Sequence, residues 1–139
     1  MTRRCMIAML ILLAAAVRPA AAGSCSGYAS TISFPDYHSS TVDITGSVTV
    51  TCSSGTSYHI GLNAGITPGA TINNRLMFGG DGGQNTLGYQ LFSDAAHALT
   101  WGNSSGTNWV SGTGNGNSQQ YTIYARIPGG QSSDRKSVV

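Results

Sequence analysis

The sequence predicts an all-β fold, an antiparallel β-sandwich, and two observations support this prediction. Gly, Ser, Thr and Asn dominate the polar positions of the 139 residues, and Glu is absent. These polar residues and glycine have low helix propensity for steric and hydrogen-bonding reasons. Apolar and polar residues also alternate in several short segments separated by turn-rich connectors, as in sheets of short antiparallel strands.

The alternating segments define the predicted strands, because a period of two sends successive side chains to opposite faces of a sheet. In the first clear segment, for example, Val48 and Val50 face inward and Thr49 faces away. We expect strands at residues 44–52, 58–64, 87–91 and 121–127, with a weaker strand at 29–34.

One connector is long for a hairpin loop, namely residues 102–119. Trp109 and Val110 are candidates for a short strand within it. The chain shows neither an internal repeat nor a stripe of apolar residues at helical spacing, so no helix is predicted.

Residues 1–22 have the pattern of a secretory signal peptide. Arg3 and Arg4 precede an uncharged apolar stretch, and small residues follow it up to Ala22. The apolar stretch has roughly 12 residues, whereas a membrane-spanning helix needs about 20, so no stable membrane insertion is expected. Cleavage after Ala22 would leave a single exported domain, residues 23–139.

Removal of the signal peptide reverses the charge of the chain. The full sequence has a net charge of +2, but without Arg3, Arg4 and Arg18 four Lys and Arg remain against five Asp, a net charge of −1. Four scattered cations form no basic patch, so we expect no nucleic-acid partner.

Cys25 and Cys52 are the cysteines that remain after cleavage. Two thiols in an oxidising compartment predict one disulfide. Linking positions that lie 27 residues apart would stabilise a small domain by about 3–4 kcal/mol on the loop-entropy account.

No set of residues predicts catalysis, a cofactor site or a metal centre. His38, His59 and His97 are far apart, and neither Glu nor a Cys/His cluster accompanies them. Asp94 lies near His97, but this pair alone is weak evidence for a serine hydrolase, and no nucleophile elbow is expected. The glycine-rich residues 79–83 lack the Lys of a phosphate-binding loop and predict a turn. The chain is therefore not expected to be an enzyme.

Eight short motifs follow one another in order from Cys25 to Gln131. The motifs are Cys25 and residues 34–37 (FPDY), 46–52 (GSVTVTC), 58–65 (YHIGLNAG), 74–77 (NRLM), 87–94 (LGYQLFSD), 101–103 (WGN) and 124–131 (YARIPGGQ). In this order they resemble the spore coat protein U domain that is shared with Csu-type pilins of archaic chaperone–usher systems. Residues 34–37 stand where that family usually has Phe-Gly-x-Tyr.

The resemblance implies an incomplete immunoglobulin-like sandwich that lacks its final strand and leaves a sheet edge open. Such an edge accepts a further strand through backbone hydrogen bonds. The resemblance also implies three partners: a periplasmic pilus chaperone, an outer-membrane usher, and a neighbouring pilin subunit that donates a strand. The implied location is the periplasm and then the cell surface or the extracellular space.

Both ends of the chain depart from the family pattern. Gly23 and Ser24 alone separate the expected cleavage site from Cys25, whereas a donor strand needs about five residues. We therefore expect a subunit that accepts a strand without donating one, as at a fibre tip. The final strand of the family is short or absent after Gln131, so residues 23–139 are expected to be the truncated first domain of a longer tip adhesin.

The leading functional hypothesis is a structural or adhesive subunit of a secreted chaperone–usher fibre, close to the tip and assembled by donor-strand complementation. Phe78 and Trp109 are candidate surface contacts, although core packing is the commoner role of aromatic residues. Two alternatives remain open. One is a spore coat or other secreted structural protein with the same fold, and the other is a secreted carbohydrate-binding or hydrolytic β-sandwich.

Overall fold

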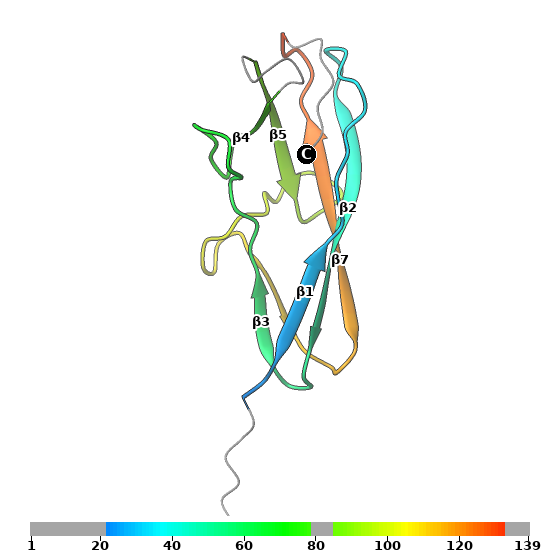
Figure 1. Cartoon of the computed structure of the whole chain (residues 1–139), viewed down its shortest axis with the longest axis vertical. Coiled ribbons are helices and arrows are strands. Elements are labelled where there is room, and N and C mark those ends of the chain that lie inside the picture. Colours follow the sequence, from blue (N-terminus) through cyan, green and yellow to red (C-terminus); the bar gives the residue numbers. More distant parts are fainter. Residues whose placement is uncertain (1–21, 79–84, 133–139) are drawn as a thin grey trace, which may run out of the picture.

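Two antiparallel sheets build the part of the chain that the computed structural model describes, residues 22–78 and 85–132 (Figure 1). The larger sheet has the strand order β1-β2-β7-β5-β4, and the smaller sheet pairs β3 with β6. The strands of the larger sheet are β1 (Cys25–Ala29), β2 (Val42–Cys52), β4 (Arg75–Phe78), β5 (Thr86–Phe92) and β7 (Ser118–Ile127). Those of the smaller sheet are β3 (Ser57–Ile60) and β6 (Val110–Thr113).

Some sequence predictions fall outside the described residues. These are the signal peptide as far as residue 21, the glycine-rich turn at residues 79–83, and the chain end at residues 133–139. Among the described residues, no helix is both long enough and apolar enough to span a membrane.

The long strands β2 and β7 form the centre of the larger sheet. They pair along their whole length, from Val42 opposite Ile127 to Thr51 opposite Ser118. The outer strands each cover one end only: β1 pairs with the last five residues of β2, and β5 pairs with β7 near Arg126. The larger sheet is therefore open and curled, as in an incomplete immunoglobulin-like sandwich, and its two ends have different neighbours (Figure 1).

The prediction of an antiparallel all-β fold is confirmed, and four of the predicted strands correspond to β2, β3, β5 and β7. The predicted alternation holds in β5, where Leu87 and Tyr89 are buried, and in β7, where Ile123 and Ala125 are buried. Thr49 departs from it: this side chain was expected to face away from the core but is 6% exposed. Its neighbours in β1 and β7 flank it on both sides in the sheet.

The weaker strand predicted at residues 29–34 is wrong, because the strand in this region is β1, Cys25–Ala29. The ladder to β2 ends with a hydrogen bond from Ser30 N to Ser47 O. Beyond it the chain leaves the sheet and buries Phe34 and Tyr37 in the core, so the apolar residues here serve loop packing.

The remaining differences between the predicted and the observed strands concern three short strands, β3, β4 and β6. β3 ends at Ile60, although residues 62 and 64 are still partly buried while 61 and 63 are exposed. The strand considered at Trp109 and Val110 is present as β6, which begins at Val110. β4 was not predicted, since it has only four residues and its first inward residue is Arg75.

The core consists of two clusters, one at each end of the larger sheet. The first lies between β5, the end of β7 and the segment after β1, and the second lies between β2 and the smaller sheet. The first cluster contains Phe34, Tyr37, Met77, Leu87, Tyr89, Ala125 and Ile127. The second contains Val48, Val50, Cys52, Tyr58, Ile60, Trp101 and Ile123.

Candidate functional site

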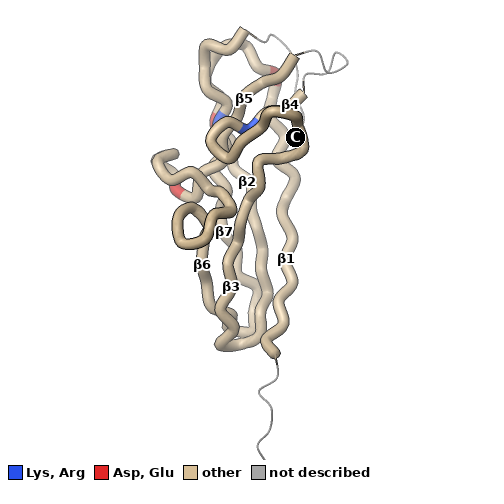
Figure 2. The backbone as a smooth tube through the Cα atoms, turned by 90° about the vertical axis from the view of Figure 1, so that its left-hand side faces the viewer, with Lys and Arg blue, Asp and Glu red and all other residues tan. Residues whose placement is uncertain are grey.

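The end of the molecule that holds the second cluster has open strand edges, and those of β1 and β3 lie next to each other. In the described residues, β1 is paired only with β2, and β3 only with β6. Both views of the backbone show β1 and β3 next to each other (Figures 1 and 2), and no ladder joins them. Neither strand contains Lys, Arg, Asp, Glu or Pro. Charged residues and proline commonly protect edge strands from pairing, so these two edges, called here the open edge pair, are unprotected.

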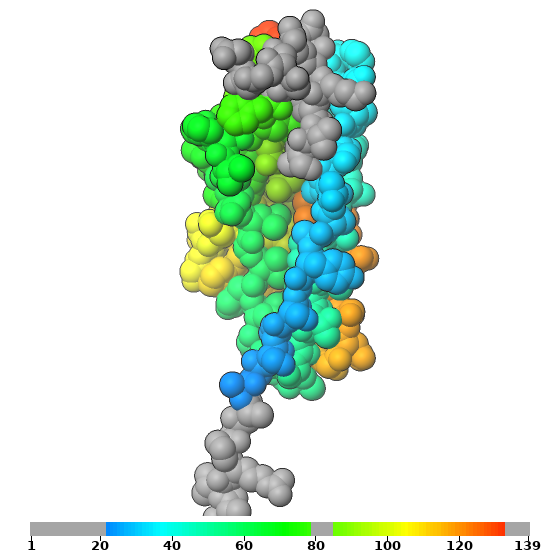
Figure 3. Space-filling view, viewed as in Figure 1, coloured from blue at the N-terminus to red at the C-terminus, as the bar shows by residue number. Residues whose placement is uncertain are grey.

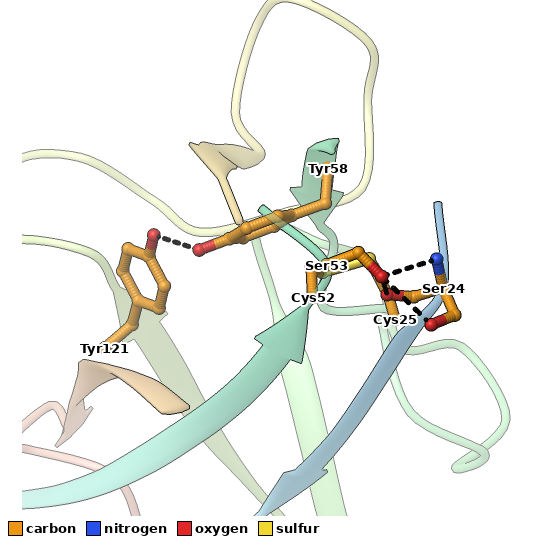
Figure 4. The surroundings of a disulfide bond; sticks show 6 residues. All are labelled: Ser24, Cys25, Cys52, Ser53, Tyr58 and Tyr121. Atoms are coloured by element: carbon orange, nitrogen blue, oxygen red, sulfur yellow. Dashed lines mark hydrogen bonds between the residues drawn. A yellow bond between two sulfur atoms is a disulfide. The ribbon is translucent and has the colours of Figure 1, made fainter. Parts of the chain in front are cut away.

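β1 is held in place with almost no help from burial. All five of its residues are exposed, including Tyr28 at 70%. A disulfide joins its first residue, Cys25, to Cys52 at the end of β2, with sulfurs 2.04 Å apart (Figure 4). Beside this bond, the hydroxyls of Ser24 and Ser53 lie 3.1 Å apart. The disulfide and the ladder to β2 therefore anchor a strand that has one edge and both faces accessible.

A pair of tyrosines connects the smaller sheet to β7 beneath the open edge pair. The hydroxyls of Tyr58 and Tyr121 lie 2.6 Å apart, and the rings meet edge to face (Figure 4). The hydrogen bond raises the pKa of Tyr58 to about 12. A Cβ at Gly112 would come within 2.5 Å of both hydroxyls, so only glycine leaves room for this pair. The smaller sheet is thus fixed to the larger one by a specific contact.

Charged residues are almost absent from this end. No Lys, Arg, Asp or Glu occurs between Asp43 and Arg75, or between Asp94 and Arg126. In Figure 2, the blue of Lys and Arg and the red of Asp and Glu accordingly appear only at the opposite end and on one loop. Like-charge repulsion would therefore not oppose the approach of another strand to the open edge pair.

Arg75 occupies the junction between the two sheets. Its side chain is fully buried, and its guanidinium donates to the carbonyls of Asn63, Ile72, Leu62 and Trp101 at 2.7–3.0 Å. Burial lowers the pKa of Arg75, which has no carboxylate partner among the described residues. Carbonyl oxygens replace the water that this cation loses, so Arg75 links β4 to the chain that follows β3 and to the segment before β6.

A second set of buried polar contacts closes the end of the sheet that carries β5. The Tyr37 hydroxyl donates to Pro128 O at 2.8 Å and accepts from Gln131 N at 3.0 Å. The Gln131 side chain accepts from Gly88 N at 2.7 Å and donates to Gly88 O at 2.9 Å. This end is therefore tied together by side-chain bonds to the backbone.

An ion pair between two strands of the larger sheet has a histidine beside it. Arg126 donates two hydrogen bonds to the Asp43 carboxylate, at 2.7 and 2.8 Å, and these bonds lower the pKa of Asp43. His97 Nε2 lies 3.7 Å from the same carboxylate, and its ring packs against Phe92 and Tyr124. Asp43 and Arg126 are register partners on adjacent strands, so this is a cross-strand ion pair with a histidine beside it.

The structure brings together no catalytic residues at the positions considered from the sequence. The Asp94 carboxylate accepts from the amides of Ala98 and Leu99, which lowers its pKa, and so organises its own loop. Residues 102–106 do match the Gly-x-Ser-x-Gly pattern, contrary to the expectation of no elbow motif. They form an exposed loop that is not a strand-to-helix turn, so Ser104 lacks the setting of a nucleophile. Within residues 22–78 and 85–132, no group of three His, Cys, Asp or Glu is placed to hold a metal.

The two candidate surface contacts lie in different surroundings. Phe78 is 46% exposed at the end of β4 and shares a pocket with the fully exposed Ile66. Trp109 is partly buried and stacks on His59, with ring centroids 4.0 Å apart. The two aromatics line separate pockets, so they do not form one surface.

Sequence reasoning missed several residues that build these features. Arg75 and Gln131 were named only as members of family motifs, with no role assigned to them. The polar residues around Trp109 were not identified as candidate binding residues. A lone arginine within an apolar segment, Arg75-Leu76-Met77-Phe78, was the one available signal of a buried cation. The contacts with carbonyls depend on the tertiary fold and leave no local pattern.

The fold and the sequence were compared with known proteins. The profile of the Spore Coat Protein U domain family matches residues 11–137. Among curated proteins, no match was found. A similar solved structure is the CsuC–CsuE chaperone–tip adhesion subunit pre-assembly complex from the archaic chaperone–usher Csu pili of Acinetobacter baumannii, with a TM-score of 0.62 and 21% identity. The alignment covers 84% of this chain and 38% of that chain, and at this identity the likeness is one of fold.

The family match rests on nearly the whole sequence, and the open sheet and the disulfide agree with it. This chain belongs to the Spore Coat Protein U domain family.

Proposed function

We propose that this chain is a structural or adhesive subunit of a secreted surface fibre of the chaperone–usher type. It acts close to the fibre tip and receives a strand from a periplasmic chaperone and then from a neighbouring subunit, with an outer-membrane usher assembling the fibre. It passes through the periplasm to the cell surface. The family and the fold support this proposal, and so does the solved complex, in which the similar fold belongs to a chaperone–tip subunit assembly.

The open edge pair is the observation that carries the proposal. An added strand gains affinity from backbone hydrogen bonds to an unpaired edge. Both β1 and β3 offer such an edge, without the charges or prolines that would prevent pairing. β1 is exposed on both faces, so an incoming strand would also bury side chains that the isolated chain leaves in water.

Capture by a chaperone tests this proposal. The full chain would be co-expressed in a bacterial periplasm with a tagged candidate pilus chaperone, and the complex would be isolated through the tag. We expect stable co-purification of the wild-type chain. Expressed without the chaperone, the chain should associate with itself as its concentration rises, because unpaired edges template association, and its stability is therefore measured on dilute samples.

A matched pair of variants makes the test specific to the edge. Tyr28→Lys places a charge on the exposed edge strand β1, and Thr122→Lys places the same charge at an exposed position of the central strand β7. We expect Tyr28→Lys to reduce capture and Thr122→Lys to leave it unchanged. Equal capture of both variants, or a chain that stays monomeric at high concentration in the absence of the chaperone, would contradict the proposal.

The spore coat alternative remains a second candidate because the family itself is named for a coat protein. A structural coat protein with this fold would need no chaperone or usher. The presence of chaperone and usher genes next to the gene for this chain favours the fibre, and their absence favours the coat.

A further inference from the structure

A cleft lies between two loops on the flank of the molecule, outside the open edge pair. Its volume is about 410 Å³, within the range of small-molecule sites, about 300–1,000 Å³. Three segments line it: Asn73, the loop at residues 93–100, and the loop that ends at Trp109. In the space-filling view the second loop forms the yellow projection, on the far side of the smaller sheet from β1 (Figure 3).

Both loops are held in shape by internal hydrogen bonds. In the first loop, Ser93 N donates to Leu99 O, and the Asp94 carboxylate accepts from two amides that follow it. In the second loop, Gly102 N donates to Asn108 O, and Asn108 Oδ1 accepts from Ser104 N at 2.8 Å. The walls of the cleft are therefore largely formed before a ligand arrives, which lowers the entropic cost of binding.

The aromatic wall of the cleft is braced from behind. The Trp109 indole stacks on the His59 imidazole with an angle of 7° between the rings. His59 Nδ1 in turn shares a 3.0 Å hydrogen bond with the hydroxyl of Ser111, its register partner in β6. His59 covers one face of the indole and so holds the ring in place, and Trp109 lines the cleft.

The polar wall carries hydrogen-bonding groups that the protein does not use. In the described part of the chain, the side-chain amide of Asn73, the Thr100 hydroxyl and the Trp109 indole N–H have no hydrogen-bond partner. Asn108 uses only its amide oxygen, which leaves Nδ2 free to donate. The cleft thus offers both donors and acceptors beside an aromatic ring.

The lining of the cleft contains no charged residue. Asp94 lies in the same loop, but its carboxylate points into the loop's own amides. A ligand with a net charge would therefore find no counter-charge here and would lose hydration without compensation. The cleft instead suits a neutral molecule with an apolar face for the indole and a rim of hydroxyl groups.

A pyranose ring has this combination of features, since its C–H groups form an apolar face and its hydroxyls both donate and accept. From these observations we infer that the cleft binds a neutral saccharide, with Trp109 as the platform and Asn73 and Thr100 as hydrogen-bonding partners. This binding is independent of strand addition, because the loop that ends at Trp109 and lines the cleft lies on the side of the smaller sheet away from β1 (Figures 1 and 3).

Calorimetric titration of the full chain tests the inference. The probes are neutral disaccharides (maltose, cellobiose, lactose, mannobiose and N,N′-diacetylchitobiose), with glucosamine and galacturonic acid as charged comparisons. At least one neutral disaccharide should bind with a dissociation constant in the millimolar range or tighter, and the charged sugars should bind more weakly. Trp109→Ala should weaken binding by at least about tenfold, as expected for loss of an aromatic anchor.

Additional variants separate a binding role from a folding role. Asn73→Ala and Thr100→Val each remove an unused polar group and should weaken binding by about fivefold, the value for one hydrogen bond. Phe78→Ala removes an exposed aromatic outside the cleft and should bind as the wild type does. Each variant must still be captured by the chaperone, and Tyr28→Lys must still bind the sugar.

The inference is overturned if no neutral disaccharide of the panel binds. It is also overturned if Trp109→Ala, Asn73→Ala and Thr100→Val all bind as tightly as the wild type. If Trp109→Ala fails to fold, the other two variants decide the question, since Asn73 is exposed and Thr100 is partly exposed, and Thr100→Val keeps the size of the side chain.

Discussion

At one end of the larger sheet, where β7 pairs with β5, side chains bond to the backbone of neighbouring segments. Tyr37, Gln131 and Arg75 make these bonds; Tyr37 and Arg75 are buried and Gln131 is partly buried. At the other end, where β2 pairs with β1, an exposed strand is held by a disulfide, and β1 and β3 each have an edge without a partner in the described residues. One end is complete in itself, and the other leaves the edges of β1 and β3 open.

This difference separates the open edge pair from the part of the chain that is held by side-chain bonds to the backbone. Such bonds gather where β4, β5 and β7 meet, and the open edge pair lies away from this junction. In the proposed assembly, the complete end would keep the sheet folded while the open end exchanges partners, because stability is distributed unevenly over a structure. The following predictions sharpen or break this comparison, from the largest expected effect to the smallest.

Replacement of Arg75 should have the largest effect on stability. Arg75→Met removes the guanidinium and leaves four carbonyls without their donor, of which the Trp101 carbonyl is the partner in a fully buried contact. We expect the free energy of unfolding to fall by about 3–5 kcal/mol. Denaturant titration measures this change. Arg126→Met is the matched control: its ion pair is exposed, and its loss should cost less than about 1 kcal/mol. A similar fall in the free energy of unfolding for both variants would show that the bonds of Arg75 to the carbonyls do not stabilise the fold.

Loss of the disulfide should come next and should act locally. The double variant Cys25→Ala, Cys52→Ala should lower the free energy of unfolding by about 3 kcal/mol. Because β1 buries no side chain, we also expect it to detach before the rest unfolds. Hydrogen exchange should show a much larger loss of protection in β1 than in β5, because β1 opens locally while β5 opens with the rest of the fold. Uniform loss of protection in both strands would contradict the division into two ends.

Removal of the Tyr37 hydroxyl should have a smaller effect at the complete end. Tyr37→Phe deletes the bonds to Pro128 O and Gln131 N and should cost about 1–2 kcal/mol. Tyr28→Phe removes a hydroxyl from a 70% exposed side chain and should be neutral. Thermal melts of the two variants give the comparison, and equal melting temperatures would mean that the Tyr37 contacts contribute nothing.

The tyrosine pair should make stability depend on pH only in alkaline solution. The pKa of Tyr58 is raised to about 12, above the ordinary value of 10.0, because its hydroxyl is bonded to Tyr121. The folded state therefore holds this proton longer than the unfolded state, and its contribution is complete below pH 10 and is lost between about pH 10 and pH 12. Denaturation midpoints across this range should fall for the wild type and fall less for Tyr58→Phe. Parallel pH profiles would show that another group is responsible.

The strands that could be predicted from the sequence are those with a local signal. Residues 87–91 and 121–127 alternate without interruption, and both became strands with the expected buried face. Cys25 and Cys52 are the cysteines that follow the expected signal peptide, so their pairing was also accessible.

Features that depend on distant contacts could not be predicted. The apolar residues after Ala29 resemble a strand, but Phe34 and Tyr37 enter the core from a loop. β4 is too short to show a period, and Arg75 looks like a surface residue until its carbonyl partners are known. The cleft beside Trp109 combines three segments that are separated in the sequence, and only the fold brings them together.

Hydrogen exchange of the chain bound to a candidate periplasmic pilus chaperone tests the central claim most directly. We predict that binding protects amides of β1 and β3, the open edge pair, and leaves β4, at the far edge of the larger sheet, unchanged. Protection confined to β4, or no change in β1 and β3 when the chaperone is bound, would contradict the account.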